Sequence, residues 1–201
     1  MRFGWTPAFA GVTKYHGGMP GPDEQLMLAY AGGDAAAFEA LYGKHKGPVF
    51  RYVLRSVKGR GEAEELFQDI WMRVIEAAGR YTPQAKFTTW LYTIAHNRLV
   101  DHWRARGLAV VSLDDEEASV PELVAAPGSE PHLVAEARET LDRLAAALAA
   151  LPLAQREAFL LHHEGDLTAA EIAAATGTHE EAAKSRLRYA MNKLREAIGD
   201  D

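Results

Sequence analysis

The sequence contains no cysteine, and this absence removes several kinds of chemistry at once. Without thiols the chain can form no disulfide, use no cysteine nucleophile and offer no sulfur ligand to zinc. It also has no apolar run near the roughly 18–20 residues that a membrane span requires. From these two absences we expect a protein of the reducing cytoplasm that has no membrane partner.

The sequence also lacks the patterns that are typical of catalytic and metal sites. Eight histidines are present, but no HExxH spacing occurs and no pair of carboxylates stands out. The adjacent His162 and His163 would point about 100° apart on a helix, which is a poor arrangement for sharing one metal ion. We therefore expect no enzyme activity, no cofactor and no metal site.

Acidic residues are concentrated in one segment of the chain. The whole chain has a formal net charge of -6, whereas residues 107–142 contain nine Asp or Glu and one Arg. That segment therefore carries -8, and the rest of the chain carries +2. Residues 107–132 also contain three prolines, and we interpret them as a flexible acidic linker.

On both sides of this linker, apolar residues recur at helical spacing. Residues 23–106 and residues 133–199 are each predicted to form a small helical domain, so the expected fold class is all-α. Residues 1–22 contain glycines and prolines that interrupt any signal-peptide core. We interpret them as a disordered tail or as the product of a misassigned start codon, with Met19 and Met27 as alternative starts.

Glycine, proline and capping residues predict the helix boundaries of the first domain. The Gly-Gly-Asp sequence at residues 32–34 indicates a helix end followed by a new N-cap. Gly47-Pro48 indicates another boundary, and Pro83 ends a later helix. The helix that follows is expected to be capped by Thr88 or Thr89.

Residues 168–198 have the pattern of a helix-turn-helix. Thr168 followed by Glu171 is a capping-box sequence at the start of a short first helix. Gly177 stands where the chain must turn, a position that often requires a positive φ. The second helix starts just after this turn and runs to about Ile198.

The second helix of this pair carries five cations within AAKSRLRYAMNKLRE, residues 182–196. Its buried stripe is expected to be Ala183, Leu187, Ala190, Leu194 and Ile198. The polar side chains that lie away from the stripe or on its flanks are Lys184, Ser185, Arg186, Arg188, Tyr189 and Lys193. A helix of this kind fits the major groove of DNA, where Arg and Lys bind guanine edges and phosphates. The alternative is the solvated face of an ordinary amphipathic helix.

This second helix begins with two acids, Glu180 and Glu181, which would repel phosphate if they pointed at DNA. They could stabilise the helix N-terminus or accept from cytosine N4. We expect the first role.

A second informative stretch is KFTTWLYTIAHNRLVDHWRARG, residues 86–107, which mixes four aromatic rings with cations. Stacking faces and positive charges together are what the binding of single-stranded DNA requires. The alternative is that Phe87, Trp90, Leu91 and Ile94 simply form core.

Three motifs in order, FQDIWMRV, FTTWLYTIAHNRLVDHWRAR and LPLAQREAFLLHHEGDLTAAEIAAATGTHEEAAKSRLRYA, resemble the extracytoplasmic-function (ECF) group of bacterial sigma factors over roughly residues 24–198. The resemblance implies an N-terminal domain (sigma region 2) that binds core RNA polymerase and opens the −10 promoter element. It implies a C-terminal helix-turn-helix domain (sigma region 4) that reads the −35 element. The implied partners are the β′ clamp coiled coil and β subunit of the polymerase, promoter DNA, and an anti-sigma factor of the kind that holds many members of the family.

The resemblance also implies roles for single residues. The surface for the β′ coiled coil matches Glu65, Gln68 and Asp69. The −10 surface matches Asn97 as a base contact, and the residues implied around it are Trp90, His96, Arg98, Asp101 and Arg104. The loop at residues 79–86 matches the segment that holds an extruded −10 base. The −35 positions are Lys184, Ser185, Arg188 and Tyr189, with Arg186 placed on phosphate.

One alternative function remains at this point. A helix-turn-helix transcriptional regulator that acts without stoichiometric polymerase binding would explain residues 168–198. It would not explain why the aromatic and basic stretch at residues 86–106 follows FQDIW.

Overall fold

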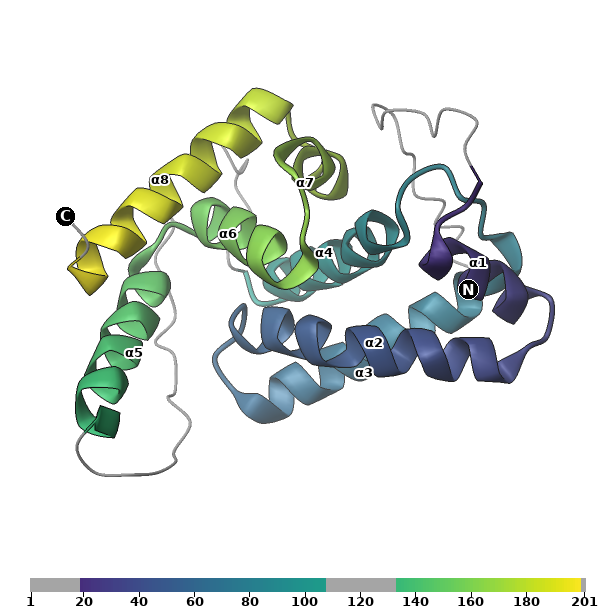
Figure 1. Ribbon diagram of the computed structural model, residues 1–201, viewed down its shortest axis with the longest axis horizontal. Coiled ribbons are helices and arrows are strands. Elements are labelled where there is room, and N and C mark those ends of the chain that lie inside the picture. The colour runs from purple at the N-terminus through teal and green to yellow at the C-terminus, as the bar shows by residue number, and fades with distance from the viewer. Residues whose placement is uncertain (1–18, 108–132, 200–201) are drawn as a thin grey trace.

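The computed structural model describes residues 19–107 and 133–199, and within these ranges the regular structure is entirely helical (Figure 1). The N-terminal half consists of α1 (Pro22–Ala31), α2 (Ala35–Leu54), α3 (Arg60–Ala77), a short 3-10 helix (Ala78–Arg80) and α4 (Phe87–Ala105). The C-terminal half consists of α5 (Leu133–Ala150), α6 (Leu153–Gly165), α7 (Ala169–Thr176) and α8 (Glu180–Ile198). The predicted all-α fold of two helical domains is confirmed. Most of the predicted tail and linker lies outside the described residues.

The boundary between α1 and α2 forms as the local sequence predicts. Asp34 is the N-cap of α2, and its carboxylate accepts hydrogen bonds from the backbone N–H groups of Ala36 (3.0 Å) and Ala37 (3.3 Å). Gly33 has φ +104°, a conformation that favours glycine. The short side chain of Asp34 therefore satisfies donors that the first turn of a helix leaves free.

The predicted boundary at Gly47-Pro48 is wrong, because α2 continues through it to Leu54. Proline removes one backbone hydrogen bond but its fixed φ is compatible with a helix. Val49, Tyr52 and Val53 follow directly and are fully buried. Their packing outweighs the local cost of the proline.

The predicted cap of α4 is also wrong. The helix begins at Phe87, one and two residues before Thr88 and Thr89. Its first backbone N–H, that of Phe87, donates to the buried carboxylate of Glu24 in α1. A residue from a different helix therefore supplies the cap.

In the C-terminal half, the predicted capping box at Thr168 and Glu171 and the predicted turn at Gly177 are confirmed. The backbone N–H of Thr168 donates to Glu171 Oε2 (2.8 Å), and the backbone N–H of Glu171 donates to Thr168 Oγ1 (3.3 Å). Gly177 ends α7 with φ +69°. These two features set the turn that leads into α8.

The two halves pack directly against each other. Figure 1 shows α6 and α7 beside α4, and one hydrophobic core runs through both halves. Gly165 makes the close approach possible, because a Cβ atom there would lie 2.7 Å from Cε2 of Tyr92 in α4. The chain is therefore closed, with its C-terminal half covering part of its N-terminal half. None of the helices in the described ranges is long and apolar enough to cross a membrane.

Candidate nucleic-acid and polymerase interfaces

The predicted recognition helix α8 presents its cations at the surface. Lys184 and Arg188 are exposed, Ser185 and Arg186 are half-buried, and half of Tyr189 is exposed. The guanidinium of Arg188 lies 5.4 Å from the centre of the Tyr189 ring, a cation–π contact that orients both side chains. All five predicted −35 residues therefore lie on one helix, and its exposed face carries Lys184, Arg188 and Tyr189.

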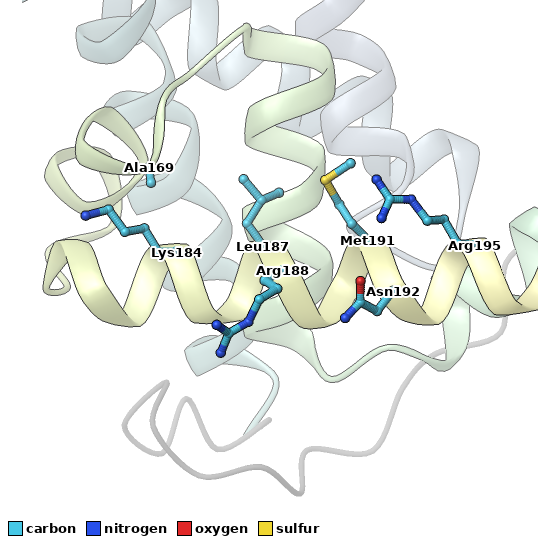
Figure 2. A pocket seen from close by; sticks show the side chains of 7 residues that line it. All are labelled: Ala169, Lys184, Leu187, Arg188, Met191, Asn192 and Arg195. Carbon is cyan, nitrogen blue, oxygen red and sulfur yellow. The ribbon is translucent and has the colours of Figure 1, made fainter. Parts of the chain in front are cut away.

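A shallow groove of about 320 Å³ follows this face of α8 (Figure 2). It is lined by Ala169 of α7 and by Lys184, Leu187, Arg188, Met191, Asn192 and Arg195 of α8. Asn192 and Arg195 were not among the residues predicted to contact DNA. Their spacing of four and seven residues from Arg188 places them on the same face, so the helical period alone could have identified them. The groove extends the candidate DNA surface by one and a half to two turns.

At the start of α8 the two acids contact a predicted DNA ligand. The ammonium of Lys184 lies 2.9 Å from carboxylate oxygens of both Glu180 and Glu181. Hydrogen bonds to these two carboxylates raise the pKa of Lys184 above its ordinary value. Both acids lie in the first turn, as expected, but their side chains engage Lys184, and no side chain caps the helix at His179.

The predicted −10 residues on α4 are much less accessible. Trp90 and His96 are both 5% exposed, and the ring of Trp90 packs against that of Tyr81 at 5.0 Å. Asn97 and Arg98 are half-buried, whereas Asp101 and Arg104 are exposed. Only some of the predicted −10 residues are therefore accessible on the surface of α4. His96, in the middle of the motif, lies under the C-terminal half.

The candidate polymerase surface lies on α3. Glu65, Gln68 and Asp69 are exposed on one face, as their spacing of three and four residues predicts. Met72 lies on the same face, and 53% of this apolar side chain is exposed. Met72 was not among the residues predicted for this surface, although it lies four residues after Gln68. Met72 therefore gives this otherwise polar face one exposed apolar side chain.

An ion pair joins this surface to the candidate −10 surface. Arg98 of α4 donates two hydrogen bonds to Asp69 Oδ2 of α3, at 3.0 and 2.7 Å. Arg73 and Asp101 form a longer contact of 3.4 Å between the same two helices. The polymerase face and the −10 face are therefore adjacent and share charged residues.

Charged contacts also hold the two halves together. Glu164 near the end of α6 accepts hydrogen bonds from Arg51 of α2 (2.7 Å) and from Arg55, the C-cap of α2. Lys86, the N-cap of α4, lies 2.8 Å from Glu171 of α7. Lys86 belongs to the loop that the resemblance assigns to an extruded base. In the described ranges, no group of three or more His, Asp or Glu is arranged to hold a metal ion.

One buried cation joins α5 to α6. Arg156 is 2% exposed and donates to the backbone carbonyls of Ala149 (2.9 Å) and Leu151 (3.2 Å) at the end of α5. Burial lowers the pKa of Arg156 to about 10. Its position therefore serves the fold of the C-terminal half rather than DNA binding.

Comparison with protein families matches both halves of the chain. The model described as Sigma-70 region 2 matches residues 41–108, and the model described as Sigma-70, region 4 matches residues 141–194. The first match covers α3 and α4, which carry the candidate polymerase and −10 surfaces. The second covers the helix-turn-helix.

Curated proteins show the same relationship over nearly their whole length. The chain is 35% identical over 166 residues to the ECF RNA polymerase sigma factor RpoE of Cereibacter sphaeroides, covering 81% of this chain and 87% of that protein. It is 33% identical over 174 residues to the RNA polymerase sigma factor CarQ of Myxococcus xanthus, covering 87% of this chain and 96% of the relative.

Two solved structures share the fold. One is the sigma factor RpoE of Bartonella quintana in complex with the anti-sigma factor NepR, with a TM-score of 0.61 at 25% identity, covering 82% of this chain and 98% of that one. The other is CnrH in complex with the cytosolic domain of CnrY, with a TM-score of 0.63 at 22% identity, covering 89% of this chain and 98% of that one. Two family models in the expected order, and relatives matched over most of their length, establish the family. The chain belongs to the ECF group of RNA polymerase sigma factors.

Proposed function

We propose that the chain binds core RNA polymerase through α3 and directs promoter-specific initiation, with α8 reading the −35 element and α4 engaging the −10 element. The observation that carries this proposal is the order of the two matched regions. A polymerase-binding face and an aromatic, basic helix come first, and a helix-turn-helix with exposed cations follows. A regulator without polymerase binding would have no use for the first region.

The proposed −35 contacts rest on the geometry of α8. A helix in the major groove reads bases with residues near its N-terminal end, and Lys184 and Arg188 lie in its first half. Arg188 can donate two hydrogen bonds to one guanine, whereas Asn192 and Arg195 lie farther along the groove, where phosphates would be reached. DNA must compete with Glu180 and Glu181 for Lys184.

The proposed −10 contacts require the two halves to separate. His96 and Trp90 are buried in the closed chain, and Lys86 is paired with Glu171. Core polymerase would hold the two halves at the spacing of the two promoter elements, so each bound element would raise the effective concentration of the other. Asn97, Arg98, Asp101 and Arg104 would then meet the strand that is being opened, with His96 released from Glu157 beside them.

The proposed polymerase contact is the α3 face formed by Glu65, Gln68, Asp69 and Met72. Acids around an exposed apolar residue provide an anchor and a charged rim, the usual composition of a protein interface. Binding to core polymerase implies a cytoplasmic location and a role as a transcription factor without catalysis of its own. We also propose an anti-sigma partner, because the structure of RpoE that resembles this chain contains one.

Association followed by transcription tests the proposal. Purified chain is mixed with purified core polymerase and separated by size exclusion, and the complex is then used for run-off transcription on genomic promoter fragments. We expect a one-to-one complex and transcripts that core polymerase alone does not make. A chain that binds duplex DNA but not core polymerase would support the regulator instead.

A further inference from the structure

A buried carboxylate of α6 joins the two halves at their centre. Glu157 is 4% exposed, and its Oε1 accepts a hydrogen bond from the hydroxyl of Tyr52 in α2 (2.9 Å). The same oxygen lies 2.6 Å from Nδ1 of His96 in α4. One acid of the C-terminal half therefore binds two helices of the N-terminal half.

This cluster exists only while the halves are closed. Tyr52 and His96 belong to the N-terminal half, and Glu157 belongs to the C-terminal half. Opening would move all three side chains from the buried interface into water. A buried ion pair is stable only when its partners stay together, because separated charges need solvation.

Other charged and titratable groups face the cluster from each neighbouring helix. Arg104 of α4 acts on His96, and Arg186 of α8 acts on Glu157. Tyr92 of α4 is also close to Tyr52, but burial raises the pKa of each phenol above its usual value, so neither titrates near neutral pH. Glu164 nearby is paired with the guanidinium groups of Arg51 and Arg55. His96 is therefore the group in the cluster that can change charge near neutral pH.

We infer that Glu157 and His96 form a pH-responsive latch, which holds the C-terminal half over α4 in mildly acidic conditions and weakens as the pH rises above neutral. The functional meaning of this latch rests on the proposed function, because it would control access of the −10 surface to DNA. The latch itself is a property of the free chain.

The sign of the pH dependence follows from the shifts of the two groups. Burial favours the neutral imidazole, but attraction and hydrogen bonding by Glu157 outweigh it, so the pKa of His96 lies above its ordinary value of 6.5 in the closed chain. Burial also favours a protonated Glu157, but His96 and Tyr52 reverse this, so the pKa of Glu157 lies below its ordinary value of 4.5. Opening returns both groups toward their ordinary values.

Each shift stabilises closure over a definite range of pH. The contribution of His96 is fully present below its ordinary pKa of 6.5 and is lost as pH rises through the higher value of the closed chain. The contribution of Glu157 is present above 4.5 and is lost as pH falls through its lowered value. Closure is therefore strongest between pH 4.5 and 6.5. Its loss above neutral pH is partial, because a neutral imidazole can still donate to Glu157.

A distance measurement on the free chain tests the latch without polymerase or DNA. The absence of cysteine lets Ala40→Cys and Glu196→Cys carry two dyes, one on each half, at exposed positions. Energy transfer is measured from about pH 6 to about pH 8.5. We expect the ratio of open to closed chain to rise several-fold across this range.

Two variants distinguish the effect of the Glu157 charge from the effect of the hydrogen bonds in the cluster. Glu157→Gln keeps the size and hydrogen-bonding capacity of the side chain but has no carboxylate, so burial of His96 then favours the neutral imidazole and closure should no longer weaken as the pH rises. Tyr52→Phe removes one hydrogen bond without removing a titrating group, so closure should weaken while the pH response persists. Glu39→Gln, at an exposed carboxylate of α2, is the control and should behave as wild type. Circular dichroism confirms that each variant is helical.

A ratio that does not change with pH in the wild type would overturn the inference, and so would an unchanged response in Glu157→Gln. Failure of this test would leave polymerase binding and run-off transcription unaffected. Conversely, a working latch in a chain that does not bind core polymerase would remove only its proposed role in promoter access.

Discussion

The two candidate DNA-binding helices differ in what the closed chain does with them. On α8, Lys184 and Arg188 are exposed along an open groove (Figure 2). On α4, His96 and Trp90 are buried, and His96 binds an acid from the other half. The closed chain thus leaves the surface proposed for duplex DNA open and covers part of the surface proposed for single-stranded DNA.

This difference has a physical reason. Duplex DNA is bound by polar and cationic groups. These groups are well solvated in water, so the exposure of α8 carries no free-energy penalty. Binding unstacked bases needs aromatic rings, which are more stable when they are covered. A helix that stacks on bases is therefore well suited to pack against its own chain until DNA replaces that contact.

The strongest test of the comparison removes the exposed cations of α8. Lys184→Ala combined with Arg188→Ala should lower transcription from −35-dependent promoters by about 100-fold or more, since each base or phosphate contact is worth roughly tenfold. Core polymerase binding should be unchanged. Run-off transcription and size exclusion measure the two effects. Lys193→Ala, an exposed cation of the same helix that does not line the groove, is the control. Equal losses in the control would show that net charge alone matters.

The next test concerns the α3 surface proposed to bind core polymerase, which lies beside α4. Met72→Glu should weaken binding to core polymerase by about 2 kcal/mol, because a charge would replace the exposed apolar anchor of the α3 face. Fluorescence titration of labelled chain with core polymerase measures this. Leu28→Glu makes the same chemical change at an exposed residue of α1, and it should bind normally. If both variants bind alike, the polymerase surface lies elsewhere.

Closure itself can be broken at the close approach of the two halves. Gly165→Ala places a Cβ atom 2.6 Å from Leu167 Cδ1 of its own half and 2.7 Å from Tyr92 Cε2 of the other half, and overpacking of this kind costs about 1–3 kcal/mol. The halves should separate, which increases the radius of gyration measured by small-angle X-ray scattering. Gly43→Ala is a suitable control, because its Cβ would meet nothing within 4 Å. A compact Gly165→Ala chain would mean that the tyrosine ring simply moves.

The smallest expected effect compares a helix cap in each half. Asp34→Ala and Thr168→Ala should each lower the free energy of unfolding by about 1 kcal/mol, measured by urea denaturation. Thr168→Ala should also reduce closure, since Thr168 orients Glu171, which pairs with Lys86 of the N-terminal half. Asp34→Ala should leave closure as it is. Energy transfer between dyes on the two halves distinguishes these outcomes.

Features set by neighbouring residues could be predicted from the sequence. The Thr168–Glu171 box and the Asp34 cap act within three residues, and the turn at Gly177 is a property of one residue. The groove residue Asn192 follows from the same helical period, since it lies four residues after Arg188, but the predicted DNA contacts ended at Tyr189. Helical periodicity thus predicts most of the residues on the exposed face of α8.

Features set by distant residues could not be predicted in this way. Glu157 lies 61 residues from His96 and 105 residues from Tyr52. The position of Glu157 within α6 does not indicate either partner, so the sequence did not predict that His96 is buried. Pro48 is a second example, because tertiary packing maintains a helix that the local signal would have ended.

The cap that Glu24 provides for α4 sets a limit on how far the chain can be shortened. A polypeptide that begins at Met19 keeps α1 whole, whereas one that begins at Met27 loses the carboxylate on which Phe87 N–H depends. The later start would shorten α1, but the helix that loses its cap is α4, which carries Asn97. Translation from the later methionine would therefore yield a protein whose damage appears some sixty residues downstream, in the helix proposed to engage the −10 element.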